Sequence, residues 1–152
     1  METDRIRIDK VGMSEGLKAK QGSFKVILDS NAFFVPLRFK IDVFEDLKTL
    51  LNRNFTPVLI PVVRREIEKM AKTASPKVRK EAAYALKLAE KCRLIKVDEE
   101  EGSADDAVVK AAVELGAAVF TNDTKLRKRL RNINVPVIYV RQKSHLKIDG
   151  RL

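Results

Sequence analysis

The sequence has few of the residues that build metal centres from nitrogen and sulfur. Its 152 residues include one cysteine and one histidine, which excludes an internal disulfide framework and zinc sites built from Cys or His. Any metal ion bound here must therefore be held by oxygen ligands. There are only six glycines, and none lies in a phosphate loop that ends in Gly-Lys-Ser/Thr, which disfavours a nucleotide kinase.

Long hydrophobic runs are also missing. No stretch reaches the roughly 18 consecutive apolar residues of a membrane span, and the N-terminus lacks the charged-then-apolar layout of a signal peptide. We therefore expect a cytoplasmic protein with no membrane partner. The length and the composition, 45% hydrophobic and 34% charged residues, are typical of one globular domain.

Positive charge is in excess, with a formal net charge of +10. Residues 124–152 hold nine Lys or Arg and one acid, Asp149, so most of the surplus lies in the last fifth of the chain. A surplus of this kind indicates a polyanionic partner, either nucleic acid or an acidic membrane surface.

Short apolar runs alternate with amphipathic stretches from residue 24 onward. Five runs have the length of buried strands, at 26–28, 58–60, 94–97, 117–120 and 137–140. The stretches 42–54, 62–72, 76–92, 103–115 and 124–131 have helical spacing or helix-boundary signals. This alternation predicts an α/β fold, with a central parallel sheet covered by helices on both faces. We expect a flexible or peripheral leader over 1–22, the domain over 23–141 and a basic C-terminal tail over 142–152.

Acidic residues stand at positions where parallel strands end. Asp29 directly follows the first buried run, at the edge where open α/β sheets bind ligands, although capping of the following turn would also explain it. Glu66 lies at the border of the apolar stripe of its helix, where an ion pair with Lys69 is the plainer explanation.

Two further acidic groups lie later in the chain. Asp105 and Asp106 follow Ser103 at the start of a helix, where a capping box and the helix dipole could account for both. Asp123 follows the fourth buried run, after Thr121 and Asn122, and could cap the next helix. If these acids converge over one edge of the sheet, their mutual repulsion requires a cation, and a hard divalent ion such as Mg²⁺ or Mn²⁺ is the natural occupant.

The motifs around these acids resemble a known family. Leu28-Asp29-Ser30-Asn31, Glu66, the segment from Ser103 to Ala112, and Thr121-Asn122-Asp123 are similar, in order and spacing, to the four acidic motifs of PIN-domain nucleases. The resemblance covers about residues 24–140. The basic helix after Asp123 looks most like the archaeal relatives of the ribosomal-RNA processing branch.

The resemblance implies a three-layer α/β/α sandwich and a Mg²⁺- or Mn²⁺-dependent endoribonuclease that hydrolyses RNA phosphodiester bonds, with ribosomal-RNA processing as a candidate role. It implies that the metal-binding and catalytic acids are Asp29, Glu66, Asp106 and Asp123. Asp106 is preferred to Asp105 because the family pattern has a small and then an aliphatic residue after the acid, and Asp105 is kept as a helper. Asn31, Asn122 and Thr121 are expected to support the acids. The bases expected to bind RNA are Lys125, Lys128, Arg129 and Arg131.

Other functions stay open at this point. A catalytically silent, RNA-binding PIN domain that acts in assembly would keep the same acids, and a VapC-type toxin ribonuclease would share the same chemistry. A response-regulator-like domain phosphorylated on Asp29 is disfavoured by Asp29-Ser30-Asn31, which lacks a paired Asp-x-Asp site. The expected partner is RNA, and a homodimer or a regulatory or ribosome-assembly protein are further alternatives. We expect Cys92 in the core, Tyr139 buried on its strand and His145 in the basic tail.

Overall fold

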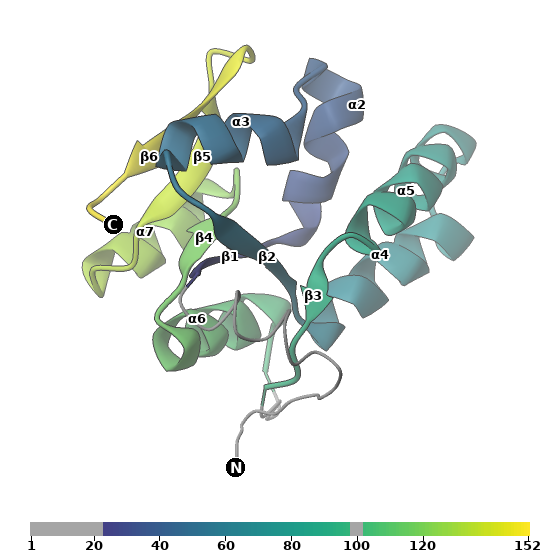
Figure 1. Ribbon diagram of the computed structural model, residues 1–152. Coiled ribbons are helices and arrows are strands. Elements are labelled where there is room, and N and C mark those ends of the chain that lie inside the picture. Colours follow the sequence, from purple (N-terminus) through teal and green to yellow (C-terminus); the bar gives the residue numbers. More distant parts are fainter. Residues whose placement is uncertain (1–22, 98–101) are drawn as a thin grey trace, which may run out of the picture.

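A six-stranded sheet forms the centre of the protein in a computed structural model, which describes residues 23–97 and 102–152. The strand order is β3-β2-β1-β4-β5-β6 (Figure 1). The strands are β1 (Phe24–Leu28), β2 (Phe55–Leu59), β3 (Arg93–Leu94), β4 (Ala118–Phe120), β5 (Val137–Arg141) and β6 (His145–Asp149). The first five run parallel, and β6 pairs antiparallel with β5.

Helices cover both faces of this sheet. They are the 3₁₀ helix η1 (Ser30–Phe34), α2 (Val35–Phe39), α3 (Val43–Leu51), α4 (Pro61–Thr73), α5 (Pro76–Ala89), α6 (Ala104–Leu115) and α7 (Thr124–Asn132). Figure 1 shows α2 and α3 on one side of the sheet and α6 and α7 on the other, with α4 and α5 side by side near β3. The predicted three-layer α/β/α sandwich is therefore confirmed.

The sheet departs from the prediction at its last strand. Residues 145–149 lie in the segment that we expected to be a basic tail, yet they pair with β5 as β6. The turn that joins the two strands has positive φ at Gln142 and Lys143, a conformation usually supplied by Gly or Asn. Without those residues the sequence carried no hairpin signal. The sheet is accordingly mixed rather than wholly parallel.

The segment after β1 also holds structure that the pattern did not indicate. η1 and α2 occupy residues 30–39, and Ala32, Phe33, Phe34 and Val35 are all buried. A continuous apolar run buried on all sides has no periodicity, so helix and loop cannot be told apart from the sequence. The predicted leader over 1–22 lies outside the described residues.

The carboxyl ends of the parallel strands meet at one edge of the sheet. Val26, Ile27 and Leu28 of β1 and the whole of β4 are buried, which explains why these strands read as uninterrupted apolar runs. The chain leaves this edge toward η1 after β1, toward α4 after β2 and toward α7 after β4. In the described ranges, no helix is long and apolar enough to cross a membrane.

Candidate active site

Asp29 lies at the carboxyl end of β1 and is 4% exposed. Its backbone N–H donates to the carbonyl of Phe120 at 3.0 Å, which continues the pairing of β1 with β4. Its Oδ1 accepts the N–H of Ser30 at 2.9 Å. Its Oδ2 accepts the hydroxyl of Thr121 at 2.8 Å and the side-chain amide of Asn31 at 3.2 Å. The carboxylate is thus held rigidly beneath the edge of the sheet.

Asn31 and Asn122 tie the ends of three strands together. The amide of Asn31 also donates to the Thr121 hydroxyl oxygen at 3.2 Å, and its carbonyl oxygen accepts the N–H of Asn122 at 2.9 Å. The side chain of Asn122 in turn accepts the N–H of Val140 in β5 at 2.8 Å. The structure therefore brings all three expected supporting residues into one network around Asp29.

Asp123 follows β4 and caps α7. Its Oδ1 accepts the N–H groups of Lys125 and Leu126 at 2.9 and 3.1 Å, and its own N–H donates to the Thr121 hydroxyl oxygen at 3.1 Å. Its Oδ2 has no hydrogen bond from the described residues. One carboxylate oxygen is therefore left for a ligand while the other fixes the helix.

Asp106 is occupied by structural contacts. It forms a capping box with Ser103, in which its Oδ2 accepts the Ser103 N–H and its own N–H donates to the Ser103 hydroxyl. Its Oδ1 lies 2.6 Å from a guanidinium nitrogen of Arg129 on α7. The Arg129 contact, followed by the Ser103 backbone N–H, holds the pKa of Asp106 below its usual range.

Asp105 has the opposite electrostatic environment. Burial raises its pKa first, and repulsion from Asp123 and Glu66 raises it further. The side chains of neighbouring helix residues point about 100° apart, so Asp105 and Asp106 face different surroundings. Asp105 interacts with the acids Asp123 and Glu66, whereas Asp106 pairs with Arg129.

Glu66 lies on the exposed side of α4, the helix that follows β2. Its charge acts on both Asp29 and Asp105. The pKa of Asp29 is raised, mainly because burial removes its carboxylate from water and then because Asp105 and Glu66 repel it. The hydrogen bonds from Thr121 and Ser30 act in the lowering direction without cancelling this effect.

We define the acidic cluster as Asp29, Glu66, Asp105 and Asp123. The negative charges of these residues act on one another. Asp29 interacts with Glu66 and Asp105, and Asp105 interacts with Asp123. Its donors are all oxygen atoms, which suits a hard divalent cation. Within residues 23–97 and 102–152, no three or more His, Cys, Asp or Glu side chains lie close enough together to hold a metal ion. The donor chemistry fits such an ion, but the described side chains do not form a closed coordination shell.

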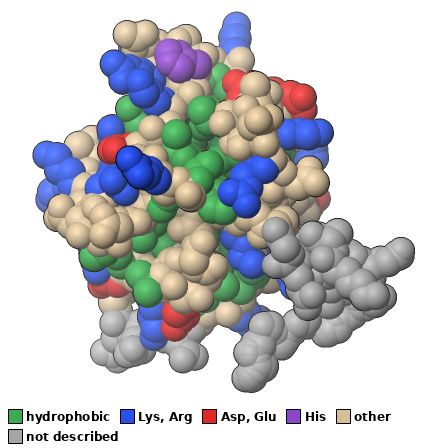
Figure 2. Space-filling view, turned by 60° about the vertical axis from the view of Figure 1, so that its left-hand side comes forward, with side chains coloured by type: hydrophobic (Ala, Val, Ile, Leu, Met, Phe, Trp, Pro, Cys, Tyr) green, Lys and Arg blue, Asp and Glu red, His purple; other side chains and the backbone are tan. Residues whose placement is uncertain are grey.

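The predicted RNA-binding bases divide into two kinds. Lys125 and Lys128 are exposed on α7, whereas Arg129 pairs with Asp106 and Arg131 lies 3.4 Å from Asp149 of β6. Figure 2 shows the side of the molecule that carries β6 and α7, where Lys and Arg side chains surround a band of hydrophobic ones. The bases available for a phosphate backbone are therefore fewer than the sequence count implies.

Asp149 is a structural residue that the sequence interpretation left without a role. It also accepts from Arg127, whose guanidinium lies 3.7 Å above the ring of Tyr139. Its position as the single acid among nine bases was the signal, because such an acid is expected to find a basic partner. Cys92 is half-buried against the core, and His145 is exposed and contacts Ser144.

The chain is similar to several known proteins. The family described as PIN like domain matches residues 26–143. Ribonuclease VapC4 of Methanocaldococcus jannaschii is 30% identical over 84% of this chain and 98% of its own length. The rRNA-processing protein fcf1 of Schizosaccharomyces pombe is 29% identical over 77% of this chain and 59% of its own length. The solved structure of the PIN domain endonuclease Utp24 is 27% identical and superposes with a TM-score of 0.71, covering 84% of this chain and 92% of that one. The chain therefore belongs to the PIN-like domain family.

Proposed function

We propose that this protein is a divalent-metal-dependent endoribonuclease that hydrolyses RNA phosphodiester bonds at the acidic cluster. The observation that carries the proposal is the buried carboxylate of Asp29, which is repelled by Glu66 and Asp105 and lacks a basic partner among the described residues. Such a group is stabilised by a bound cation. The names of the related proteins, two of them a ribonuclease and an endonuclease, support the same activity.

We propose Asp29, Glu66, Asp105 and Asp123 as the residues that hold the ion, Mg²⁺ or Mn²⁺, in part through its bound water molecules, since no three described acidic side chains lie close enough to contact one ion at once. This set replaces Asp106, the acid implied by the family pattern, with its neighbour. Asp105 shares charge with the cluster, while both oxygens of Asp106 already contact Ser103 and Arg129. In this proposal Asp106 positions α7 against α6 instead of binding metal.

The protein groups then have distinct tasks in the reaction. A divalent ion held by the acidic cluster would supply an activated water molecule as the nucleophile and would offset negative charge at phosphorus and on the leaving 3′-oxygen. Asp29 provides an anchored oxygen, since Thr121, Asn31 and Ser30 fix its orientation. Lys125 and Lys128, on the helix that Asp123 caps, attract the phosphates that flank the scissile bond. The expected products carry a 5′-phosphate and a 3′-hydroxyl.

Cleavage of single-stranded and structured RNA in Mn²⁺ or Mg²⁺ tests this function. Asp29→Asn and Asp105→Asn should each reduce the cleavage rate about 100-fold or more, the usual cost of removing a group that stabilises reacting charge. Asp106→Asn should cleave at close to the wild-type rate, and Glu114→Gln, an exposed acid on the same helix, serves as the matched control. Undiminished cleavage by Asp29→Asn would contradict the acidic cluster as the site of hydrolysis, and absence of cleavage by the wild-type protein would favour a silent RNA-binding domain.

The biological role has two candidates, each favoured by one of the relatives. Similarity to Ribonuclease VapC4 favours a toxin that an antitoxin protein would restrain, and similarity to fcf1 and Utp24 favours ribosomal-RNA processing. We propose the processing role first because one solved structure, that of Utp24, combines a TM-score of 0.71 with a sequence identity of 27%. Sequencing of the 5′ ends that accumulate in cells would separate the two, since processing predicts ends confined to precursor ribosomal RNA.

A further inference from the structure

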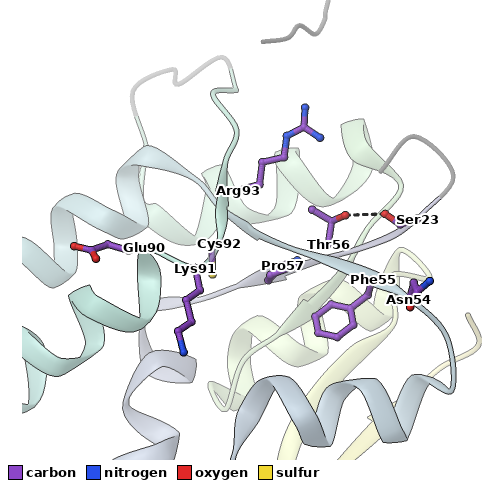
Figure 3. A pocket seen from close by; sticks show the side chains of 9 residues that line it. All are labelled: Ser23, Asn54, Phe55, Thr56, Pro57, Glu90, Lys91, Cys92 and Arg93. Carbon is purple, nitrogen blue, oxygen red and sulfur yellow. Dashed lines mark hydrogen bonds between the residues drawn. The ribbon is translucent and has the colours of Figure 1, made fainter. Parts of the chain in front are cut away.

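A cavity of about 520 Å³ opens at the amino ends of the strands, on the edge of the sheet opposite the acidic cluster. The cavity is lined by Ser23, which precedes β1, by Asn54 and the first three residues of β2, by residues 90–92 between α5 and β3, and by Arg93 of β3 (Figure 3). Its volume is in the range of small-molecule sites, about 300–1,000 Å³. A strand of five residues spans roughly 15 Å, so the cavity is separate from Asp29.

Two partly buried cations lie near the amino ends of the strands, Arg93 in the cavity lining and Lys25 on β1 next to it. Lys25 pairs in register with Thr56, and Arg93 is opposite Val58, which lies two residues further along β2. Because side chains two residues apart in a strand lie on the same face, those of Lys25, Thr56 and Arg93 share one face of the sheet. Burial lowers the pKa of both Lys25 and Arg93, and the Arg93 charge lowers that of Lys25 further. Among the described residues neither cation has an ion pair with a carboxylate.

A buried hydroxyl completes the polar lining. Thr56 is 4% exposed, and its hydroxyl lies 2.7 Å from that of Ser23. When Ser23 acts as the donor in this pair, the Thr56 proton remains for a ligand. Figure 3 shows the Thr56 and Arg93 side chains on the same side of β2, whereas Glu90, the acid of the lining, points away from them.

We propose that Arg93 and the Thr56 hydroxyl in the cavity lining, together with Lys25 beside them on the same face of the sheet, bind a phosphate group, free or carried by a nucleotide. Two like charges that repel each other are both stabilised by one dianion between them, and arginine suits phosphate because its planar fork donates two parallel hydrogen bonds. The cavity extends well beyond the volume of a phosphate ion, which leaves room for the rest of a nucleotide. The site is distinct from the acidic cluster and does not depend on the proposed nuclease activity.

Titration of the ¹⁵N-labelled protein with inorganic phosphate and, separately, with adenosine monophosphate tests the site without metal or RNA. Saturable shifts of the Thr56, Arg93 and Leu94 amides are expected at constant ionic strength, with chloride as the reference anion. Arg93→Gln should weaken phosphate binding about tenfold or more, the scale of a lost charge-assisted contact. Lys96→Gln, an exposed lysine three residues away, should change it less than about twofold.

The two ligands distinguish the sources of the phosphate group. Tighter binding of adenosine monophosphate would assign the cavity to a nucleotide, and equal binding would assign it to phosphate alone. Shifts that do not saturate, or that Arg93→Gln leaves unchanged, would overturn the proposal. If the variant does not fold, the wild-type melting temperature gives the second measurement, because it should rise with phosphate and not with chloride at equal ionic strength.

Discussion

The hydroxyl of Thr121 should stabilise the protein in a pH-dependent way. It is fully buried, donates to Asp29 at 2.8 Å, and accepts from the Asn31 amide and the Asp123 N–H. Thr121→Val keeps the shape of the side chain and removes all three contacts. At pH 7 the loss of a hydrogen bond to an ionised group costs about 1.5–3 kcal/mol, and the two donors left without an acceptor add about 1 kcal/mol. The expected decrease in the free energy of unfolding is therefore about 3 kcal/mol.

Acidification should reduce this loss. The pKa of Asp29 is raised in the folded protein, mainly by burial, so protonation of Asp29 favours folding and its benefit is lost as pH rises through that pKa. The Thr121 hydrogen bond acts in the lowering direction, and its removal raises the pKa further. The variant should thus gain more stability than wild type as pH falls toward the ordinary value of 3.8. At that pH only a neutral hydrogen bond is missing, so the difference should shrink by about 1–1.5 kcal/mol.

Urea unfolding with a chelator present, at pH 7 and at pH 4, measures both quantities. Thr121→Ser provides the control because it keeps the hydroxyl and loses only a methyl group, which costs about 1 kcal/mol at every pH. A loss in Thr121→Val that is the same at the two pH values would refute the proposed charge-assisted bond to Asp29. So would equal pH dependence in the Ser and Val variants.

Three further outcomes test other parts of the structure. Gly150→Ala should lower the free energy of unfolding by about 1–3 kcal/mol in thermal melts, because φ is +109° and the added Cβ would lie 2.5 Å from Arg131. An unchanged melting temperature would contradict the close packing of the Arg131 side chain against Gly150. Burial raises the pKa of the Cys92 thiol to about 12. Iodoacetamide at pH 8 should therefore modify Cys92 roughly 100-fold or more slowly than a free thiol, as followed by mass spectrometry. A modification rate like that of a free thiol would show that the Cys92 thiol is accessible. Lys128→Gln should reduce the slope of log binding constant against log salt concentration for RNA by about 0.7. Arg131→Gln should mainly lower the stability of the protein, because its contact with Asp149 is lost. The reverse result would reassign the RNA-contacting bases.

The order of strands and helices could be predicted closely from the sequence. Each predicted strand overlaps an observed one, because a strand covered on both faces must be apolar throughout. β6 was missed although Leu146 and Ile148 alternate with polar residues as antiparallel strands do. Its turn reaches positive φ through Gln142 and Lys143, and only the pairing with β5 compensates for that backbone conformation.

The sequence also predicted which polar residues would meet at the edge of the sheet. Asp29 and Asp123 follow buried strands, and parallel strands end at a common edge, so their approach is a consequence of chain order. The same reasoning extends to Asn31 and Thr121, whose hydrogen bonds to Asp29 need only the pairing of β1 with β4.

The tertiary structure alone decided how the remaining charges are distributed. Asp105 and Asp106 are adjacent in a helix, so which one joins the acidic cluster depends on the rotation of α6, fixed by the burial of Val108, Ala111 and Ala112. The same holds for Arg129 and Arg131, whose partners lie 23 and 18 residues away. Local patterns fix which residues are buried and where elements end, because those depend on near neighbours. The pairing of charges distant in the sequence depends on how whole elements pack, and that decides which bases are held in ion pairs.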